Sequence, residues 1–379
     1  MAFGRVRVPA TRVSVVAHDM ATALGVGAET CWDALLAGRV ALAPDPRFYP
    51  SDAGQCYPVG AVSACDAPEA EGRSRFMRLV SCLLPAMRGA IPADAKLILA
   101  TTIGEIDLLE TSVREGAAGD GSPLGTLAAV RATLGLTRPG LLLSAACASS
   151  TAALAAGAEW IASGKEDCVC VLGCDALSEF AYSGFLSLQA LSAGLSQPFA
   201  ASRDGLNLGE GVGFILLMSE RRAREENRPR LGRVAGWGQS SDAYHATTPD
   251  PDGKGLSRAI RAAMACAGTA PEDIAAICAH GTGTPFNDAM EERAFATGFA
   301  GRPSPLFGIK GSLGHTLGAA GVIEAIFSLL ALRDGRVPPT AGNAALPGAR
   351  IAGAFALTTN SGFGGINAAL VLHREEAGA

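Results

Sequence analysis

Short apolar segments alternate with helical segments along almost the whole chain, and this alternation restricts the fold more than any other feature. Apolar runs such as Lys96–Ala100, Cys168–Leu172 and Ile274–Ala279 have the length and composition of buried strands. Stretches such as Leu124–Leu134 and Gly255–Ala267 predict helices between them. Strands that alternate with helices predict an α/β protein built on a mainly parallel sheet with both faces covered.

The size of the chain leaves room for two coupled lobes or for one large α/β domain. It has 379 residues, of which 49% are hydrophobic and 18% are charged, so we expect a globular protein with a large core. Residues 208–220 and 363–375 each contain a glycine turn, then an apolar strand, then a charged stop. This weak internal echo favours two related lobes.

The stretch Ser144–Leu154 (SAACASSTAAL) places one cysteine among small residues, between a predicted strand and a predicted helix. Backbone N–H groups at the start of a helix favour negative charge, so Cys147 is a candidate thiolate nucleophile. The alanines around it leave room for a substrate. Cysteine is also a common buried core residue, so both interpretations stay open on this stretch alone.

Two further loops follow predicted strands and carry histidines. His280 begins a glycine turn in which Thr282 and Thr284 alternate around Gly283, so their hydroxyls can point the same way, toward a polar chain. Open α/β sheets place their sites in loops at the carboxyl ends of strands. His280 is therefore a candidate functional residue, with a backbone-bonded turn histidine as the alternative.

The second of these loops, residues 308–321, holds Lys310 and His315 on either side of a glycine-rich turn. It lacks the GxxxxGK[ST] order of a nucleotide-binding loop. Glu324 follows within the apolar run Thr316–Leu332, where a carboxylate needs a partner, and Lys310 is the nearest candidate. A carboxylate at the centre of this run predicts a buried helix rather than a membrane span.

Phe363 stands between glycines in the turn TNSGFGGIN, residues 359–367. The turn is either a plain glycine-rich connection or a hinge that places an aromatic gate and a free N–H. Cys168, Cys170 and Cys174 cluster around one predicted strand without zinc-ligand spacing, so we expect core packing there and no metal site.

Charge and cysteine usage exclude several classes of protein. The formal net charge of −5 argues against general binding of nucleic acid. Only a short apolar strand follows the first twelve residues, so no secretory signal is expected. The ten cysteines include no CxxC pair. We therefore expect a cytoplasmic protein with free thiols.

Taken together, these motifs resemble the elongating β-ketoacyl-acyl carrier protein synthases, the condensing enzymes of the thiolase superfamily. Cys147, His280, Lys310, His315 and the Gly-Phe-Gly-Gly turn stand in the order typical of that family, and residues 197–199, 203–205 and 209–211 also match it. The resemblance covers the chain from about residue 12. It implies a five-layered α-β-α-β-α fold from two duplicated halves. Residues 1–225 would carry the cysteine, and residues 226–379 the His, Lys and Gly-Phe-Gly-Gly loops.

The resemblance also implies a reaction, the decarboxylative Claisen condensation of a malonyl unit on a carrier protein with an acyl chain on Cys147. The product would be a β-ketoacyl-carrier protein in fatty acid, polyketide or polyene biosynthesis. His280 and His315 would stabilise the enolate. The N–H groups of Cys147 and Phe363 would form the oxyanion hole, and Phe363 would gate the acyl chain. The other implied roles are electrostatic support by Lys310 and Glu324 and binding of the phosphopantetheine arm by Thr282 and Thr284.

The implied partners are an acyl carrier protein and a second subunit, in a homodimer or in a heterodimer with a related ketosynthase-like chain. No cofactor is implied beyond the phosphopantetheine that the carrier protein brings. A carrier protein is acidic, and the densest cationic cluster is formed by Arg73, Arg75 and Arg78, so these arginines are a candidate docking surface. A solvated helix face is the alternative.

Two other functions compete with condensation: a non-catalytic subunit like a chain-length factor, and a relative that transfers acyl groups or decarboxylates without condensing. The first type typically lacks the cysteine that this chain retains at position 147. A histidine at position 315 favours a carrier-bound primer over acyl-coenzyme A. Residues 101–107 depart from the family's glycine-rich version and resemble synthases of bacterial polyene-pigment clusters, which leaves the substrate open.

Overall fold

The computed structural model describes residues 11–48, 56–66, 73–116, 121–301 and 304–375. The stretch 43–75, which the sequence predicts to be mostly loop, lies partly outside these ranges. Its described part contains two short 3-10 turns, at Pro46–Phe48 and Ser63–Asp66, and ends at the start of a helix.

One 11-stranded sheet runs through the described part of the chain in the order β4-β3-β5-β6-β1-β7-β13-β12-β8-β9, with β2 beside β1. Its strands in the first half of the chain are β1 (Val13–Thr22), β2 (Gly25–Val26), β3 (Lys96–Ala100), β4 (Leu141–Leu143), β5 (Cys168–Asp175) and β6 (Gly211–Ser219). Those in the second half are β7 (Gly232–Ser241), β8 (Ile274–Cys278), β9 (Leu306–Phe307), β12 (Phe355–Gly362) and β13 (Ile366–His373). A separate two-stranded sheet pairs β10 (Arg336–Val337) with β11 (Ala349–Arg350).

The two halves of this sheet repeat one topology. Leaving out β2 and counting strands along the chain within each half, both halves have the spatial order 3-2-4-5-1. Each pair of neighbouring strands in one half has the same orientation, parallel or antiparallel, as the corresponding pair in the other half. The halves meet where residues 13–15 of β1 pair with β7. The repeated order supports the predicted duplication, and the predicted division after Glu225 falls between α8 (Glu220–Glu225) and β7.

The expectation of a mainly parallel sheet is wrong, because the five neighbouring pairs from β5 across to β12 are antiparallel. The last strand of each half returns without a crossover helix packed on the sheet. For β12 and β13 the connection is the tight turn at residues 362–366, in which Gly364 and Gly365 have φ of 84° and 75°. Antiparallel strands can be joined by such a short turn, whereas parallel strands cannot.

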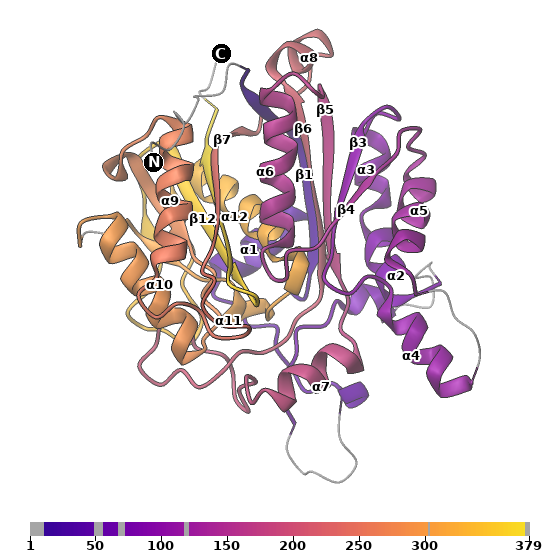
Figure 1. The fold of residues 1–379 in the computed structure, drawn as a ribbon, viewed down its shortest axis with the longest axis vertical. Helices are drawn as coiled ribbons and strands as arrows, with labels where there is room; N and C mark the ends of the chain where they lie inside the picture. Colours follow the sequence, from indigo (N-terminus) through magenta and orange to yellow (C-terminus); the bar gives the residue numbers. More distant parts are fainter. Residues whose placement is uncertain (1–10, 49–55, 67–72, 117–120, 302–303, 376–379) are drawn as a thin grey trace.

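The helices lie in three layers, with one half-sheet between each pair of layers, as Figure 1 shows. The helices of the first half are α1 (Ala28–Leu36), α2 (Arg75–Cys82), α3 (Leu84–Ala90), α4 (Ile106–Glu115), α5 (Pro123–Leu134), α6 (Ser149–Ala162), α7 (Glu179–Ser187) and α8. Those of the second half are α9 (Lys254–Ala267), α10 (Pro285–Gly298), α11 (Lys310–Leu313) and α12 (Ala320–Asp334). Helices α6 and α12 form the central layer. One outer layer contains α2, α3 and α5, and the other contains α9 and α10, so the fold has the five layers α-β-α-β-α.

Helices α6 and α12 form the central layer because their side chains suit burial on all sides. Residues 320–332 of α12 are all buried, Glu324 included, which confirms the predicted buried helix. Small residues in α6 allow close packing: a Cβ added at Gly157 would lie 3.1 Å from the Cγ1 atom of Val169 on β5. Among the described residues, no helix is both long and apolar enough to cross a bilayer.

Two differences from the predicted helices have local causes. The helix predicted from Phe76 to Gly89 is broken at Leu83 into α2 and α3, and Pro85 lies in the first turn of α3. Proline lacks the N–H that a continuous helix requires and is tolerated in a first turn. Helices α4 and α7, which the apolar spacing did not predict, pack against each other.

Candidate active site

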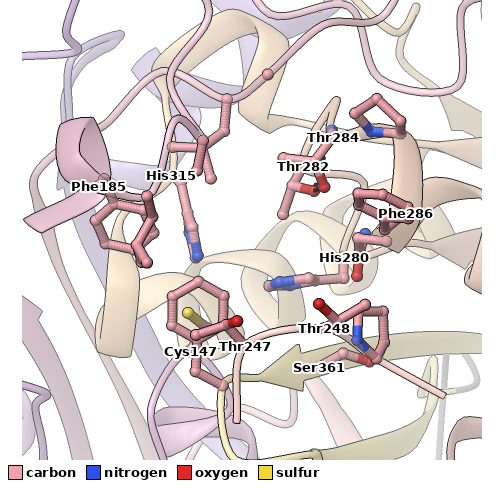
Figure 2. Close-up of a pocket in the computed structure, with 18 of the residues that line it drawn as sticks. Cys147, Phe185, Thr247, Thr248, His280, Thr282, Thr284, Phe286, His315 and Ser361 are labelled. Atoms are coloured by element: carbon pink, nitrogen blue, oxygen red, sulfur yellow. Dashed lines mark hydrogen bonds between the residues drawn. The ribbon is translucent and has the colours of Figure 1, made fainter. Parts of the chain in front are cut away.

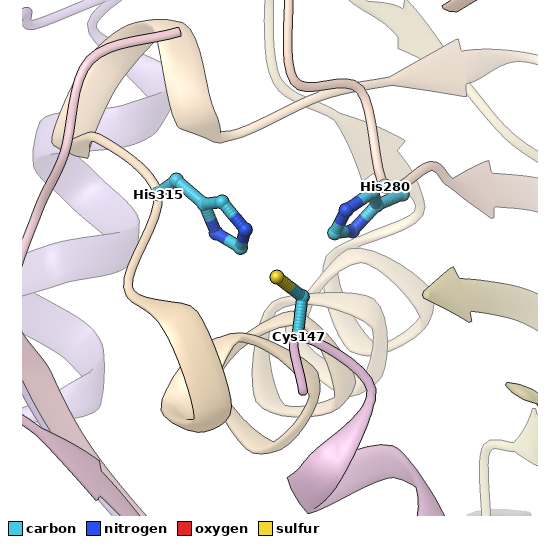
Figure 3. Close-up of side chains that lie close together, drawn as sticks. All are labelled: Cys147, His280 and His315. Carbon is cyan, nitrogen blue, oxygen red and sulfur yellow. The ribbon is translucent and has the colours of Figure 1, made fainter. Parts of the chain in front are cut away.

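Cys147 lies in the short turn between β4 and α6, where the sequence predicts it. Ala146 has φ of 49°, a left-handed conformation that costs energy for a residue with a Cβ and is typical of functional turns. The hydroxyl of Ser149 holds the turn, since it accepts from the N–H of Ala145 at 2.8 Å and donates to the carbonyl of Ala146. Cys147 is 7% exposed, and Figure 3 shows its sulfur pointing between the imidazoles of His280 and His315.

The three side chains form one cluster: the sulfur of Cys147 and one ring nitrogen of each histidine lie within 4.8 Å of one another. The structure therefore brings together Cys147 of the first half and His280 and His315 of the second. It is the one group of three potential metal ligands found among the described residues. Cys168, Cys170 and Cys174 lie buried on β5, which confirms the predicted core packing.

Burial, rather than the helix start, dominates the acidity of Cys147. Its pKa is raised to about 12 by loss of hydration, which outweighs the opposing effect of the nearby Lys310 charge. The prediction that the start of the helix stabilises Cys147 as a thiolate is therefore wrong for the protein without substrate. The sulfur rests as a thiol and needs a base when it attacks.

His280 follows β8, and a carboxylate that the sequence did not single out holds its loop. Glu291 of α10 is fully buried and accepts from the N–H groups of His280 at 2.8 Å and Gly281 at 2.7 Å. Burial raises the pKa of Glu291 to about 8. One turn earlier, Asp288 accepts from the N–H of Gly283 at 3.2 Å. The available signal was two acidic residues three positions apart, Asp288 and Glu291, shortly after the histidine loop.

Asn360 connects the imidazole of His280 to a buried ion pair. Its Nδ2 atom donates to a carboxylate oxygen of Glu324 at 2.7 Å and lies 3.0 Å from Nδ1 of His280. A carboxylate accepts hydrogen bonds, so the atom facing Glu324 is the amide nitrogen. Nδ1 of His280 is then the acceptor, and its Nε2 carries the proton. No role for Asn360 follows from its sequence context alone.

Lys310 and Glu324 form the predicted ion pair, and both are buried. The ammonium of Lys310 also donates to the backbone carbonyl of His280 at 2.5 Å. The pair is thereby tied to the histidine loop through Lys310 and to the imidazole through Asn360. Burial raises the pKa of Glu324, while the positive charge of Lys310 opposes that rise.

His315 is buried, and neither of its ring nitrogens has a hydrogen-bond partner among the described residues. Its ring meets that of His280 edge to face, with centroids 5.2 Å apart. Asp175 steadies the following turn by accepting from the N–H of Gly318 at 2.7 Å. Burial first, and then the Lys310 charge, hold the pKa values of both imidazoles well below their usual range. Both histidines are therefore neutral at pH 7.

A cavity of about 350 Å³ opens above this cluster, as Figure 2 shows. The hydroxyls of Thr282 and Thr284 lie 2.9 Å apart on its wall, where the sequence predicts a polar chain to bind. Phe363 also lines it and stacks on Phe185 of α7 with ring centroids 5.6 Å apart. The preceding glycine lies against the cysteine turn, because a Cβ added at Gly362 would be 3.1 Å from the amide nitrogen of Cys147.

The three arginines of the predicted docking surface have different surroundings. Arg75 forms ion pairs with Glu210 and Asp66, and its side chain is 11% exposed, so its charge is already neutralised within the protein. Arg73 pairs with the buried carboxylate of Glu105. Arg78 is exposed on α2. For Arg75 the prediction of a free docking cation is wrong, because the neighbouring carboxylates are contributed by other segments.

Comparison with known proteins gives a consistent result. Two family models match: "Beta-ketoacyl synthase, N-terminal domain" over residues 105–223 and "Beta-ketoacyl synthase, C-terminal domain" over residues 231–343. A 3-oxoacyl-[acyl-carrier-protein] synthase 2 of Synechocystis sp. is 31% identical over 366 residues, which cover 87% of each chain. One from Staphylococcus aureus is 34% identical over 264 residues, which cover 64% of each chain.

Solved structures with the same fold include ketosynthases that are paired with chain length factors. The ishigamide ketosynthase/chain length factor has a TM-score of 0.84 at 27% identity, over 97% of this chain and 100% of that one. A ketosynthase from Xenorhabdus doucetiae, in complex with its chain length factor, has a TM-score of 0.82 at 28% identity, over 96% of this chain and 98% of that one.

Proposed function

The chain belongs to the β-ketoacyl synthase family, and from this premise we propose that it joins a malonyl unit on an acyl carrier protein to an acyl chain on Cys147. One observation carries the assignment of roles: a thiol and two neutral imidazoles lie within 4.8 Å at the base of one cavity. The proposal needs no cofactor beyond the phosphopantetheine that carries both substrates, and it places the reaction in the cytoplasm.

In the first step, the sulfur of Cys147 attacks the carbonyl carbon of the incoming acyl thioester. The thiol proton passes to a neutral imidazole of the cluster and then to the departing pantetheine sulfur. The N–H groups of Cys147 and Phe363 receive the negative charge on the carbonyl oxygen. The close approach of Gly362 to the amide nitrogen of Cys147 supports this pairing of donors.

In the second step, the bond between the malonyl α-carbon and its carboxylate breaks, and carbon dioxide leaves. The electron pair moves into the thioester enolate, whose oxygen accepts hydrogen bonds from His280 Nε2–H and from His315. Neutral imidazoles suit this task because each can keep one N–H donor. The unpartnered nitrogens of His315 and the proton position that Asn360 imposes on His280 support the assignment.

In the third step, the enolate carbon attacks the acyl thioester on Cys147. A carbon–carbon bond forms, the carbon–sulfur bond breaks, and the sulfur leaves as a thiolate. The positive charge of Lys310 lowers the cost of that thiolate in a buried site. Lys310 and Glu324 are thus positioning and electrostatic residues, and the product stays on the carrier protein.

Intact-mass spectrometry tests this proposal directly. Incubation with acyl-carrier protein should add one acyl group, and peptide mapping should place that group on Cys147. The Cys147→Ser variant should gain no thioester-bound acyl group. Addition of malonyl-carrier protein should then release a β-ketoacyl-carrier protein two carbons longer. Carbon dioxide without that product would indicate decarboxylation alone. No adduct with any primer would favour a non-catalytic subunit.

We also propose that the chain works as a dimer, with itself or with a related subunit. In the described sheet, β4 is a terminal strand, and its Leu141 is 37% exposed. An apolar edge strand is a ready site for pairing with another chain. Light scattering of the purified chain, alone and with a co-expressed partner, distinguishes the two assemblies.

Carrier-protein docking on α2 stays a proposal, now centred on Arg78. The Arg78→Glu variant should slow acyl transfer from the carrier protein and leave transfer from acyl-pantetheine unchanged. The Arg75→Glu variant should instead lower the melting temperature, since it places a second carboxylate beside Glu210. Equal loss with both acyl donors in Arg78→Glu would contradict docking there.

A further inference from the structure

An exposed aromatic ring stands at the mouth of the catalytic cavity. Phe286 is 71% exposed, more than any other aromatic side chain among the described residues, yet it lines the same cavity as Cys147. Most single exposed apolar residues need no explanation. This one differs, because the exposed Pro285 and the half-buried Pro249 line the same cavity, so apolar surface extends the walls of the site outward.

The segment that carries this ring follows the cavity wall from base to mouth. His280 and Thr282 are buried, Thr284 is half-buried, and Pro285 and Phe286 are exposed. Figure 2 shows Thr282, Thr284, Phe286 and His280 along one side of the cavity. Moving outward, the wall therefore offers a catalytic imidazole, then two hydroxyls, then apolar surface.

The backbone that presents Phe286 is held from within. Helix α10 begins at Pro285, and the two residues after Phe286 are buried. Asp288 accepts from the N–H of Phe199 at 2.7 Å, and Asn287 donates to Glu291 at 3.0 Å. A ring on an anchored backbone loses little conformational freedom when a ligand covers it.

The order of groups on this wall corresponds to the order of groups in a pantetheine arm. From the sulfur outward, the arm has two amides, then a hydroxyl beside two methyl groups in the pantoyl unit, and then the phosphate. We propose that Phe286, together with Pro249 of the same cavity, packs against the pantoyl methyl groups and is a determinant of arm recognition. The inference rests on the proposed function, because it assumes that the arm delivers a thioester to Cys147.

Acyl donors of three lengths test this assignment. The probes are straight-chain acyl groups on N-acetylcysteamine, which lacks the pantoyl unit, on pantetheine, and on acyl carrier protein. The readout is the kcat/KM for acylation of Cys147, with the acyl group that the wild-type protein accepts fastest. In Phe286→Ala, the ratio of the pantetheine value to the N-acetylcysteamine value should fall about tenfold, because apolar contact with the two methyl groups is lost.

Two matched variants complete the experiment. Phe286→Leu keeps an apolar side chain and should retain most of the wild-type ratio. Phe180→Ala removes another exposed aromatic, on α7, which is 61% exposed and does not line the cavity. It should leave the ratio at the wild-type value. Thermal melting of all three variants checks that the fold is intact.

Each other outcome has a distinct meaning. An unchanged ratio in Phe286→Ala would overturn the inference and leave the proposed function intact. A loss seen only with the carrier protein would place Phe286 against that protein, which also overturns it. An equal loss with all three donors would indicate a structural role and overturn it too. No acylation of the wild-type protein by any donor would overturn the proposed function itself.

Discussion

The side-chain amide of Asn360 places its nitrogen 3.0 Å from Nδ1 of His280 and 2.7 Å from a carboxylate oxygen of Glu324. One amide group thereby links a catalytic imidazole to the only buried lysine–carboxylate pair among the described residues. This link determines the tautomer of His280, because it holds the proton on Nε2, the nitrogen available to a substrate. Asn360 is therefore a positioning residue.

Replacement of Asn360 by alanine should slow malonyl decarboxylation more than it slows acylation of Cys147. Without the amide, Nδ1 loses its donor and the imidazole can take the wrong tautomer, so we expect a loss of about 10²-fold in decarboxylation. The measurement is carbon dioxide release from malonyl-carrier protein by the pre-acylated enzyme.

Thr358 on the same strand supplies the control for Asn360. Its buried hydroxyl has no hydrogen-bond partner among the described residues, so Thr358→Val should change neither rate. Equal loss of acylation and decarboxylation in Asn360→Ala would mean that the amide serves only the fold.

The histidines should not produce an acidic limb near pH 6.5 in the rate of Cys147 acylation. Burial and the Lys310 charge lower both imidazole pKa values, so the neutral base persists as the pH falls through 6. The rate should decline only at lower pH. In Lys310→Met a positive charge is removed, the histidine pKa values rise, and the limb should move to higher pH. A wild-type limb at or above pH 6.5 would contradict this account.

Alkylation by iodoacetamide should separate two cysteines by their pH dependence. Burial raises the pKa of Cys147 to about 12, so its rate should increase steadily from pH 7 to pH 10 without a plateau. The hydrogen bond that Cys82 shares with Cys65 lowers the pKa of Cys82 to about 7, so the alkylation rate of Cys82 should level off above that pH. Peptide mass mapping after timed quenching gives both rates, with Cys82→Ser as the control for peptide assignment.

Glu324→Gln should destabilise the protein far more than the loss of a surface pair. The change leaves the ammonium of Lys310 buried without its carboxylate, and such a charge costs about 3–5 kcal/mol. Urea denaturation should show this loss and a partial recovery in the double variant Lys310→Met/Glu324→Gln. Arg221→Ala, which removes an exposed ion pair with Glu225, should leave the midpoint unchanged within error. If Glu324→Gln had the same urea midpoint as the wild-type protein, the stabilising role of the buried pair would be contradicted.

The sequence by itself determined the local features of this protein. Strand length, apolar runs and glycine turns predicted the loops that carry Cys147, His280, His315 and Phe363, and the resemblance predicted that they serve one site. Backbone preferences over a few residues decide such features, so they can be read along the chain.

Only the tertiary structure decided the protonation states of the side chains on those loops and the contacts that hold the loops in place. Asn360 meets His280 and Glu324 across 80 and 36 positions of sequence, and Glu291 and Asp288 support the histidine loop from α10. The neutral thiol of Cys147 and the internal pairing of Arg75 likewise depend on which segments exclude water or bring a carboxylate close. Ionisation and pairing follow from hydration and distance in three dimensions, which are set by the packing of remote segments.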